Sequence, residues 1–151
     1  MPTFSWFAGC GVGSRCPFER RSVLRGLARS LPSLLRAYEI GTRVAAVGFD
    51  WADTRDVVGK IEEEVAELRL AIGHEGVART EEEMGDLLFS IANLSRKLGI
   101  DPESALRKAN EKFTKRFEAL EDRLHTQGRS VHEATLDEME REWAAVKNSG
   151  C

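Results

Sequence analysis

The segment 60-KIEEEVAELRLAIGHEGVARTEEEMGD-86 carries two acidic motifs, Glu63-Glu64-x-x-Glu67 and Glu83-x-x-Asp86. Because a helix turns by about 100° per residue, the glutamates of the first motif project within one sector about 100° wide. Glu83 and Asp86 are three positions apart and share a face of a second helix. If the two helices pack antiparallel, these carboxylates meet in one small volume, where like charges repel and lose hydration. A hard divalent cation with oxygen ligands would relieve that conflict.

Apolar residues in both helices recur at spacings of three and four, which predicts amphipathic helices packed through these stripes. The predicted stripes are Val58, Ile61, Val65, Leu68 and Ile72 in the first helix and Met84, Leu87, Leu88, Ile91, Leu94 and Leu98 in the second. Glu64 borders the first stripe and Glu83 lies at the edge of the second. Runs such as 62–64 and 81–83 are also typical of solvated helix faces, and Thr80-x-x-Glu83 fits a capping box. Spacing alone therefore leaves both interpretations of the acidic motifs open.

The rest of the chain predicts an all-α fold, an antiparallel helical bundle of about five helices. Besides the two acidic helices, which a break at 73–76 separates, helices are predicted at about 30–47, 102–127 and 136–147. Ser30 fits a helix cap, Gly99 a left-handed stop, and Asp101-Pro102 an N-cap followed by proline. The predicted buried side of the 102–127 helix is Ala105, Ala109, Phe113, Phe117, Leu120 and Leu124. No stretch alternates with period two for long enough to predict a strand.

Composition narrows the classes of function. The 151 residues include 22 basic and 25 acidic side chains, a net charge of −3, which makes no general electrostatic case for nucleic-acid binding. No apolar run approaches the roughly 20 residues of a membrane span, so we expect no membrane insertion. The odd number of cysteines, Cys10, Cys16 and Cys151, predicts no disulfide framework and indicates a reducing, cytoplasmic setting.

Residues 1–21 differ from the remainder in having aromatic residues among glycines and prolines, with no helical period. They lack the basic start and continuous apolar region of a signal peptide. We interpret them as a poorly ordered leader, or as sequence foreign to the domain, and expect residues 22–151 to form one domain.

Six segments, taken in order, resemble the C-terminal domain of MazG-type nucleoside triphosphate pyrophosphohydrolases, in the all-α NTP pyrophosphatase superfamily. They are LPxLLRA at 31–37, VGFDW at 47–51, EExxE at 63–67, EEMGDLLF at 82–89, KANEKF at 108–113 and RF at 116–117. The resemblance covers about Ser22–Lys147. Full-length members of the family carry a second, related domain before this one, which has no counterpart in these 151 residues.

The resemblance implies that the two acidic motifs, Glu63, Glu64, Glu67, Glu83 and Asp86, hold Mg²⁺, with Mn²⁺ as an alternative. The metal would engage the phosphates of a nucleoside triphosphate, and the products would be a nucleoside monophosphate and pyrophosphate. One carboxylate, Glu63 or Glu64, would orient or deprotonate the attacking water, and the sequence does not distinguish the two.

Substrate-binding residues are expected near the C-terminus. Lys112 and Arg116 are one helical turn apart and fit a phosphate clamp, while Trp143 would stack on a base and Lys147, one turn later, would meet phosphate. Residue type alone favours a packing role for Trp143 and a surface role for the cations. The resemblance favours nucleotide binding, and it also implies a homodimer, for which we expect an interface made by the 87–98 and 113–124 stripes.

An alternative function is a helical interaction or regulatory module that retains the scaffold without turnover. The intact carboxylate set favours the hydrolase. His74, His125 and His132 form no Glu-x-x-His pair with the acidic helices, which argues against a di-iron carboxylate bundle.

Overall fold

The structure is a computed structural model that describes residues 22–74 and 76–149, so the predicted leader lies outside the described residues. The described part contains no strand, and its helices are α1 (Ser33–Ala45), α2 (Thr54–His74), α3 (Val77–Lys97), α4 (Pro102–Thr126) and α5 (Leu136–Asn148). The predicted all-α fold of about five helices is confirmed. None of these helices is both long enough and apolar enough to cross a membrane.

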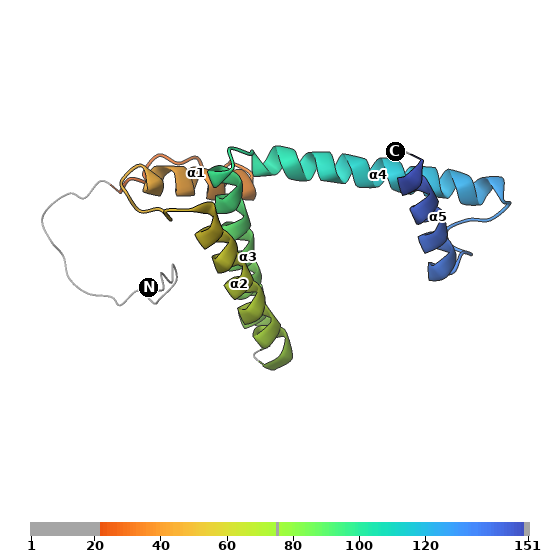
Figure 1. Cartoon of the computed structure of the whole chain (residues 1–151), viewed down its shortest axis with the longest axis horizontal. Coiled ribbons are helices and arrows are strands. Elements are labelled where there is room, and N and C mark those ends of the chain that lie inside the picture. The colour runs from red at the N-terminus through yellow and green to blue at the C-terminus, as the bar shows by residue number, and fades with distance from the viewer. Residues whose placement is uncertain (1–21, 75, 150–151) are drawn as a thin grey trace, which may run out of the picture.

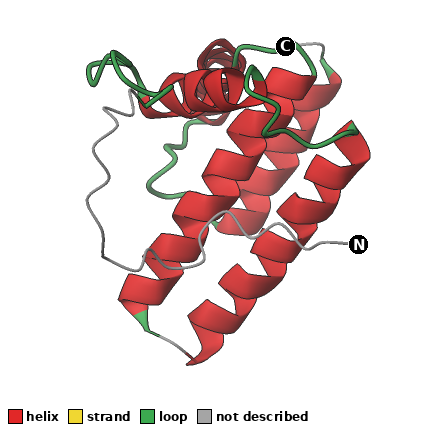
Figure 2. Cartoon of the chain, turned by 90° about the vertical axis from the view of Figure 1, so that its left-hand side faces the viewer, coloured by secondary structure: helices red, strands yellow, loops and turns green. Residues whose placement is uncertain are grey.

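The described helices form two parts. α2 and α3 lie side by side as an antiparallel hairpin, and α1 packs on α3 (Figures 1 and 2). α4 runs away from the end of that hairpin, and α5 folds back against its far half (Figure 1). Among the described helices, α5 contacts only α4. We call α4 and α5 together the α4–α5 arm.

The ends of the helices follow local sequence signals in most places. The Asp101 carboxylate accepts a hydrogen bond from the Ser104 N–H at 2.9 Å, and Pro102 occupies the first turn of α4, as predicted. Gly99, just after α3, has a φ of +67°, the left-handed conformation expected of a helix stop. The predicted cap at Ser30 is wrong, because α1 begins at Ser33 with Pro32 at the N-cap and no side-chain capping bond.

The alternative reading of Glu83 as a capping residue is also wrong. α3 begins at Val77, so Thr80 lies inside the helix, where its hydroxyl donates to the Gly76 carbonyl at 2.9 Å. Glu83 is 1% exposed and lies in the buried face of α3. The tertiary contact with α2, not the start of the helix, determines its environment.

The buried faces of α2 and α3 are rotated from the predicted stripes. α2 buries Val57, Lys60, Glu64, Leu68 and Ala71, and α3 buries Glu83, Ser90, Ala92 and Asn93. Of the predicted stripes, Val58, Ile72, Met84, Leu88, Ile91 and Leu98 are between 40% and 68% exposed. One position corresponds to about 100° around a helix, so an interface centred on the polar residues turns the apolar residues outward. The described part of the chain therefore leaves a row of apolar side chains on α3 uncovered.

The α4–α5 arm has its own small core of Leu120, Leu124 and Val146, each 1–2% exposed. The predicted continuous buried side of α4 is confirmed only near the C-terminal end of the helix, where Leu120 and Leu124 are buried. Phe113 is 58% exposed, and Ala105 and Ala109 are exposed, because α5 covers only the C-terminal half of α4. Leu120 and Leu124 are thus already covered within the chain and are not available to an interface between chains.

The α1–α2 loop is fastened to the last turns of α3. Asp50 accepts hydrogen bonds from Arg96 Nη2 at 2.5 Å and pairs with Lys97 Nζ at 2.8 Å. Burial alone would raise the pKa of Asp50, but its hydrogen bonds to Lys97 and Arg96 lower it. Gly41 lets α1 approach this region, since a Cβ at that position would lie 2.8 Å from Asn93 Oδ1. These contacts hold α1 and the α1–α2 loop against the C-terminal end of α3. The acidic residues Glu83 and Asp86 lie toward the other end of that helix.

Candidate metal centre

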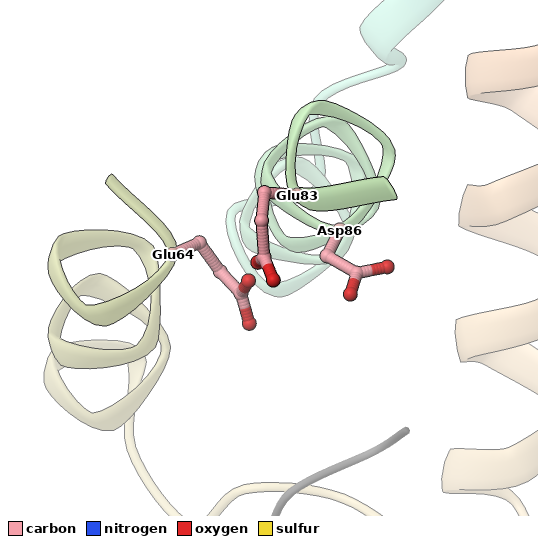
Figure 3. A group of neighbouring side chains, drawn as sticks. All are labelled: Glu64, Glu83 and Asp86. Atoms are coloured by element: carbon pink, nitrogen blue, oxygen red, sulfur yellow. The ribbon is translucent and has the colours of Figure 1, made fainter. Parts of the chain in front are cut away.

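Three carboxylates from the two acidic helices gather in one place. Glu64 on α2 and Glu83 and Asp86 on α3 project to the same side of the hairpin (Figure 3). Each offers one carboxylate oxygen, and these oxygens all lie within 4.8 Å of one another. Glu64 and Glu83 are each 1% exposed, and Asp86 is half-buried. The antiparallel hairpin therefore brings members of both predicted motifs together.

The buried glutamates each leave one oxygen without a hydrogen bond. Within the described part of the chain, neither Glu64 Oε2 nor Glu83 Oε2 has a hydrogen-bond partner. Such a group costs free energy when it is buried, and in a native structure it calls for a specific explanation. Oxygen-only donors suit hard divalent cations, and Mg²⁺ is usually held by one or two carboxylates plus substrate phosphates and water. The residues present therefore fit a Mg²⁺ or Mn²⁺ site.

The other oxygen of each buried glutamate is paired with a cation four residues earlier on the same helix. Lys60 Nζ lies 2.7 Å from Glu64 Oε1 and 2.9 Å from Glu63 Oε1, and the Lys60 side chain is 7% exposed. Arg79 pairs with Glu83 Oε1 and, at 2.7 Å, with Glu82. Neither cation was among the site residues predicted from the sequence, although the i,i+4 spacing of Lys60 to Glu64 and of Arg79 to Glu83 was an available signal.

Charge interactions extend the centre to Glu67. Burial, followed by the Glu64 and Glu83 carboxylates, raises the pKa of Glu67, which is half-buried. Burial and then the carboxylates of Glu64 and Glu82 likewise raise the pKa of Asp86, more than Arg79 and Lys60 lower it. Both shifts show that negative charge is crowded here within the described chain.

The predicted ligands thus divide into three kinds of position. Glu64, Glu83 and Asp86 form the close group, and Glu67 lies within its electrostatic field. Glu63 lies at the rim, with its side chain 50% exposed and paired with Lys60.

Burial also acts on Lys60 itself. Burial alone would lower the pKa of this lysine, but its hydrogen bonds to Glu64 and Glu63 raise it. The ammonium group therefore stays charged beside the carboxylates.

The predicted substrate-binding residues lie on the α4–α5 arm, away from the carboxylates of the same chain. Lys112 and Arg116 are on α4, and Trp143 and Lys147 are on α5, which contacts only α4 among the described helices. The Trp143 ring lies 5.1 Å from the ring of Phe113, measured between centroids, and it packs against the small core of the arm. The single chain does not bring these residues to the group formed by Glu64, Glu83 and Asp86.

The fold and the site together define an all-α domain with an acidic centre between two antiparallel helices. Residues 54–120 match the family model of the MazG nucleotide pyrophosphohydrolase domain, a segment that contains both acidic motifs, Lys112 and Arg116. Trp143 and Lys147 lie outside the matched residues. Residues 54–120 therefore belong to the MazG nucleotide pyrophosphohydrolase domain family.

Curated relatives support the assignment. The chain is 45% identical over 135 residues to the "Nucleoside triphosphate pyrophosphohydrolase" of Escherichia coli (strain K12), an alignment that covers 88% of this chain and 51% of the relative. It is 44% identical over 117 residues to the "Nucleoside triphosphate pyrophosphohydrolase/pyrophosphatase MazG" of Thermotoga maritima, covering 78% of this chain and 45% of the relative. The chain thus spans about half the length of these relatives.

Proposed function

We propose that this chain hydrolyses nucleoside triphosphates to a nucleoside monophosphate and pyrophosphate, and that it depends on Mg²⁺, with Mn²⁺ as the alternative. The observation that carries the proposal is the group formed by Glu64, Glu83 and Asp86, in which both buried glutamates leave an oxygen without a partner in the described chain. The names of the relatives from Escherichia coli and Thermotoga maritima support the choice of reaction.

The carboxylates have separate roles in this proposal. Glu64, Glu83 and Asp86 would hold the cation, with Glu67 as a further ligand. A divalent cation held there supplies positive charge to the phosphates and stabilises the charge that develops on the leaving pyrophosphate.

Glu63 is the better candidate to orient or deprotonate the attacking water. Its side chain is 50% exposed, whereas Glu64 is 1% exposed and belongs to the ligand group. A general base must reach the water, which favours the rim position.

A second copy of the chain would complete the site. The carboxylates lie on α2 and α3, and Lys112, Arg116, Trp143 and Lys147 lie on the α4–α5 arm. In a homodimer whose arms cross the partner's hairpin, both sets would meet one nucleotide.

Uncovered apolar side chains support such a dimer. Met84, Leu88 and Ile91 on α3 are 40–45% exposed, and Phe113 on α4 is 58% exposed. Burying apolar area of this kind is the main favourable term in association.

The test is release of pyrophosphate from a nucleoside triphosphate with Mg²⁺ present, for wild type, Glu64→Gln and Glu62→Gln. Glu62 is exposed and lies two positions before Glu64, so its variant controls for a general loss of charge on α2. We expect Glu64→Gln to lose activity by at least about 100-fold, because it removes a metal ligand, and Glu62→Gln to stay near wild type. A folded wild type that releases no pyrophosphate in Mg²⁺ or Mn²⁺ would favour the non-catalytic module instead.

A further inference from the structure

Lys60 is a buried cation that forms an ion pair with Glu64, a carboxylate of the proposed metal centre. Its Nζ lies 2.7 Å from Glu64 Oε1, and the two side chains are 7% and 1% exposed. A buried carboxylate stripped of a cation is an uncompensated charge, which strongly destabilises a fold. The metal-free protein therefore depends on this pair to keep Glu64 inside the hairpin.

The same carboxylate belongs to the group that fits a divalent cation. An ammonium group and a divalent cation a few ångströms apart repel each other, and partial burial strengthens that repulsion. The Glu64 carboxylate therefore cannot interact with Lys60 and with a divalent cation at the same time without weakening both interactions.

Glu63 offers the Lys60 ammonium group an alternative carboxylate partner. It lies 2.9 Å from Lys60 Nζ and its side chain is 50% exposed, so Lys60 can turn toward solvent and remain paired. The flexible four-carbon stem of lysine allows such a movement. Arg79 has a similar pair with Glu83, but its side chain is 44% exposed, where solvent screens the charge more.

We propose that Lys60 is the resident counter-ion of this centre: it compensates Glu64 in the metal-free protein and releases that carboxylate when a divalent cation binds. The inference rests on the proposed metal centre and adds an exchange of cations to it. The metal affinity is then set partly by an ion pair that must break. Lys60 is a positioning residue in this scheme.

The first test measures binding of Mn²⁺ alone to the full chain by calorimetry, for wild type, Lys60→Met, Lys60→Arg and Lys97→Met. Lys97 is the matched control, because it also forms an ion pair, with Asp50 at 2.8 Å, but eleven positions beyond Asp86 on α3. Removing a positive charge beside the site should tighten Mn²⁺ binding by about tenfold in Lys60→Met. Lys60→Arg and Lys97→Met should bind like wild type.

Thermal melting in chelator supplies a second readout for the same variants. Lys60→Met should melt below wild type without metal, because Glu64 is left uncompensated, and Mn²⁺ should raise its melting temperature more than it raises that of wild type. Lys60→Arg should recover most of the metal-free stability. A purely structural lysine would instead lower stability equally with and without Mn²⁺.

A measurement on the wild type covers the case in which Lys60→Met does not fold. Lysine acylation followed by mass spectrometry reports how accessible each ammonium group is. Labelling of Lys60 should rise several-fold when Mg²⁺ is added, while labelling of Lys97 stays constant as an internal reference.

Unchanged or weaker Mn²⁺ binding in folded Lys60→Met overturns the counter-ion role. The same conclusion follows if the labelling of Lys60 does not change when Mg²⁺ is added at a concentration at which the wild type binds it. A wild type that binds no divalent cation at millimolar concentration overturns the metal centre itself, and the counter-ion role with it.

Discussion

Glu64 and Glu83 occupy equivalent positions on the two helices of the hairpin. Each is 1% exposed, each pairs through Oε1 with a cation four residues earlier, and each leaves Oε2 without a partner among the described residues. Two carboxylates held this way on facing helices repel each other, and a divalent cation bound between them would relieve that repulsion.

Replacing Asp86 with alanine should leave the metal-free protein at least as stable as wild type while abolishing pyrophosphate release. Asp86 adds a third carboxylate to a crowded group, so its removal relieves repulsion. The measurement is a pair of melting curves in chelator beside a pyrophosphate assay. A clearly less stable Asp86→Ala that still turns over would count against the metal centre.

The stability of the metal-free protein should fall as pH rises through the range in which Glu67 and Asp86 titrate. Their pKa values are raised in the folded chain from ordinary values of 4.5 and 3.8, so the folded state holds these protons more tightly than the unfolded state. Melting curves in chelator, taken at increasing pH above 4.5, should show Glu67→Gln/Asp86→Asn gaining stability relative to wild type as pH rises. Parallel curves would contradict this.

Glu138 should stabilise the start of α5 with the opposite pH dependence, since its contribution to stability should fall as pH is lowered. Its carboxylate bonds to Arg129 and to the Thr135 N–H in a capping box, and these bonds lower its pKa from 4.5 to about 2. The stabilisation is thus fully present above pH 4.5 and disappears as pH falls toward 2. Glu138→Gln should melt below wild type at pH 7, with the difference shrinking at acid pH. The exposed Glu140→Gln should behave like wild type at both.

Gly41→Ala should destabilise the contact between α1 and α3. The new Cβ would meet Asn93 Oδ1 at 2.8 Å and Arg96 Nε at 3.0 Å, in a region where Arg96 also holds Asp50. Overpacking of this kind typically costs about 1–3 kcal/mol. Gly59→Ala is the matched control: it lies in α2 with open space around it, so it should gain about 0.5–1 kcal/mol from helix propensity. Denaturant unfolding of both variants distinguishes the two signs.

Ile91→Asp should convert the proposed dimer to a monomer. Ile91 is 40% exposed in the single chain and lies in the uncovered row of α3, so a charge there would be buried on association. Light scattering at micromolar concentration measures the change. Val77→Asp, at a position 85% exposed at the start of α3, should leave the assembly unchanged. A wild type that is already monomeric would refute the dimer.

Local signals in the sequence determined the helices and most of their ends. Asp101-Pro102 starts α4 and Gly99 follows α3 because capping and left-handed turns depend on residues a few positions apart. The proximity of Glu64 to Glu83 and Asp86 was also predictable, since helical spacing and an antiparallel hairpin suffice to bring the three side chains together.

Only the tertiary structure decided which faces are buried. The hairpin packs through Lys60, Glu64 and Glu83, although the apolar spacing favoured a face rotated from theirs. Periodicity ranks faces by hydrophobicity, but it cannot include the ion pairs that let charged groups enter an interface. It also cannot show that Phe113 stays 58% exposed although the Trp143 ring of α5 lies beside it, because the reach of one helix along another depends on the path of the whole chain.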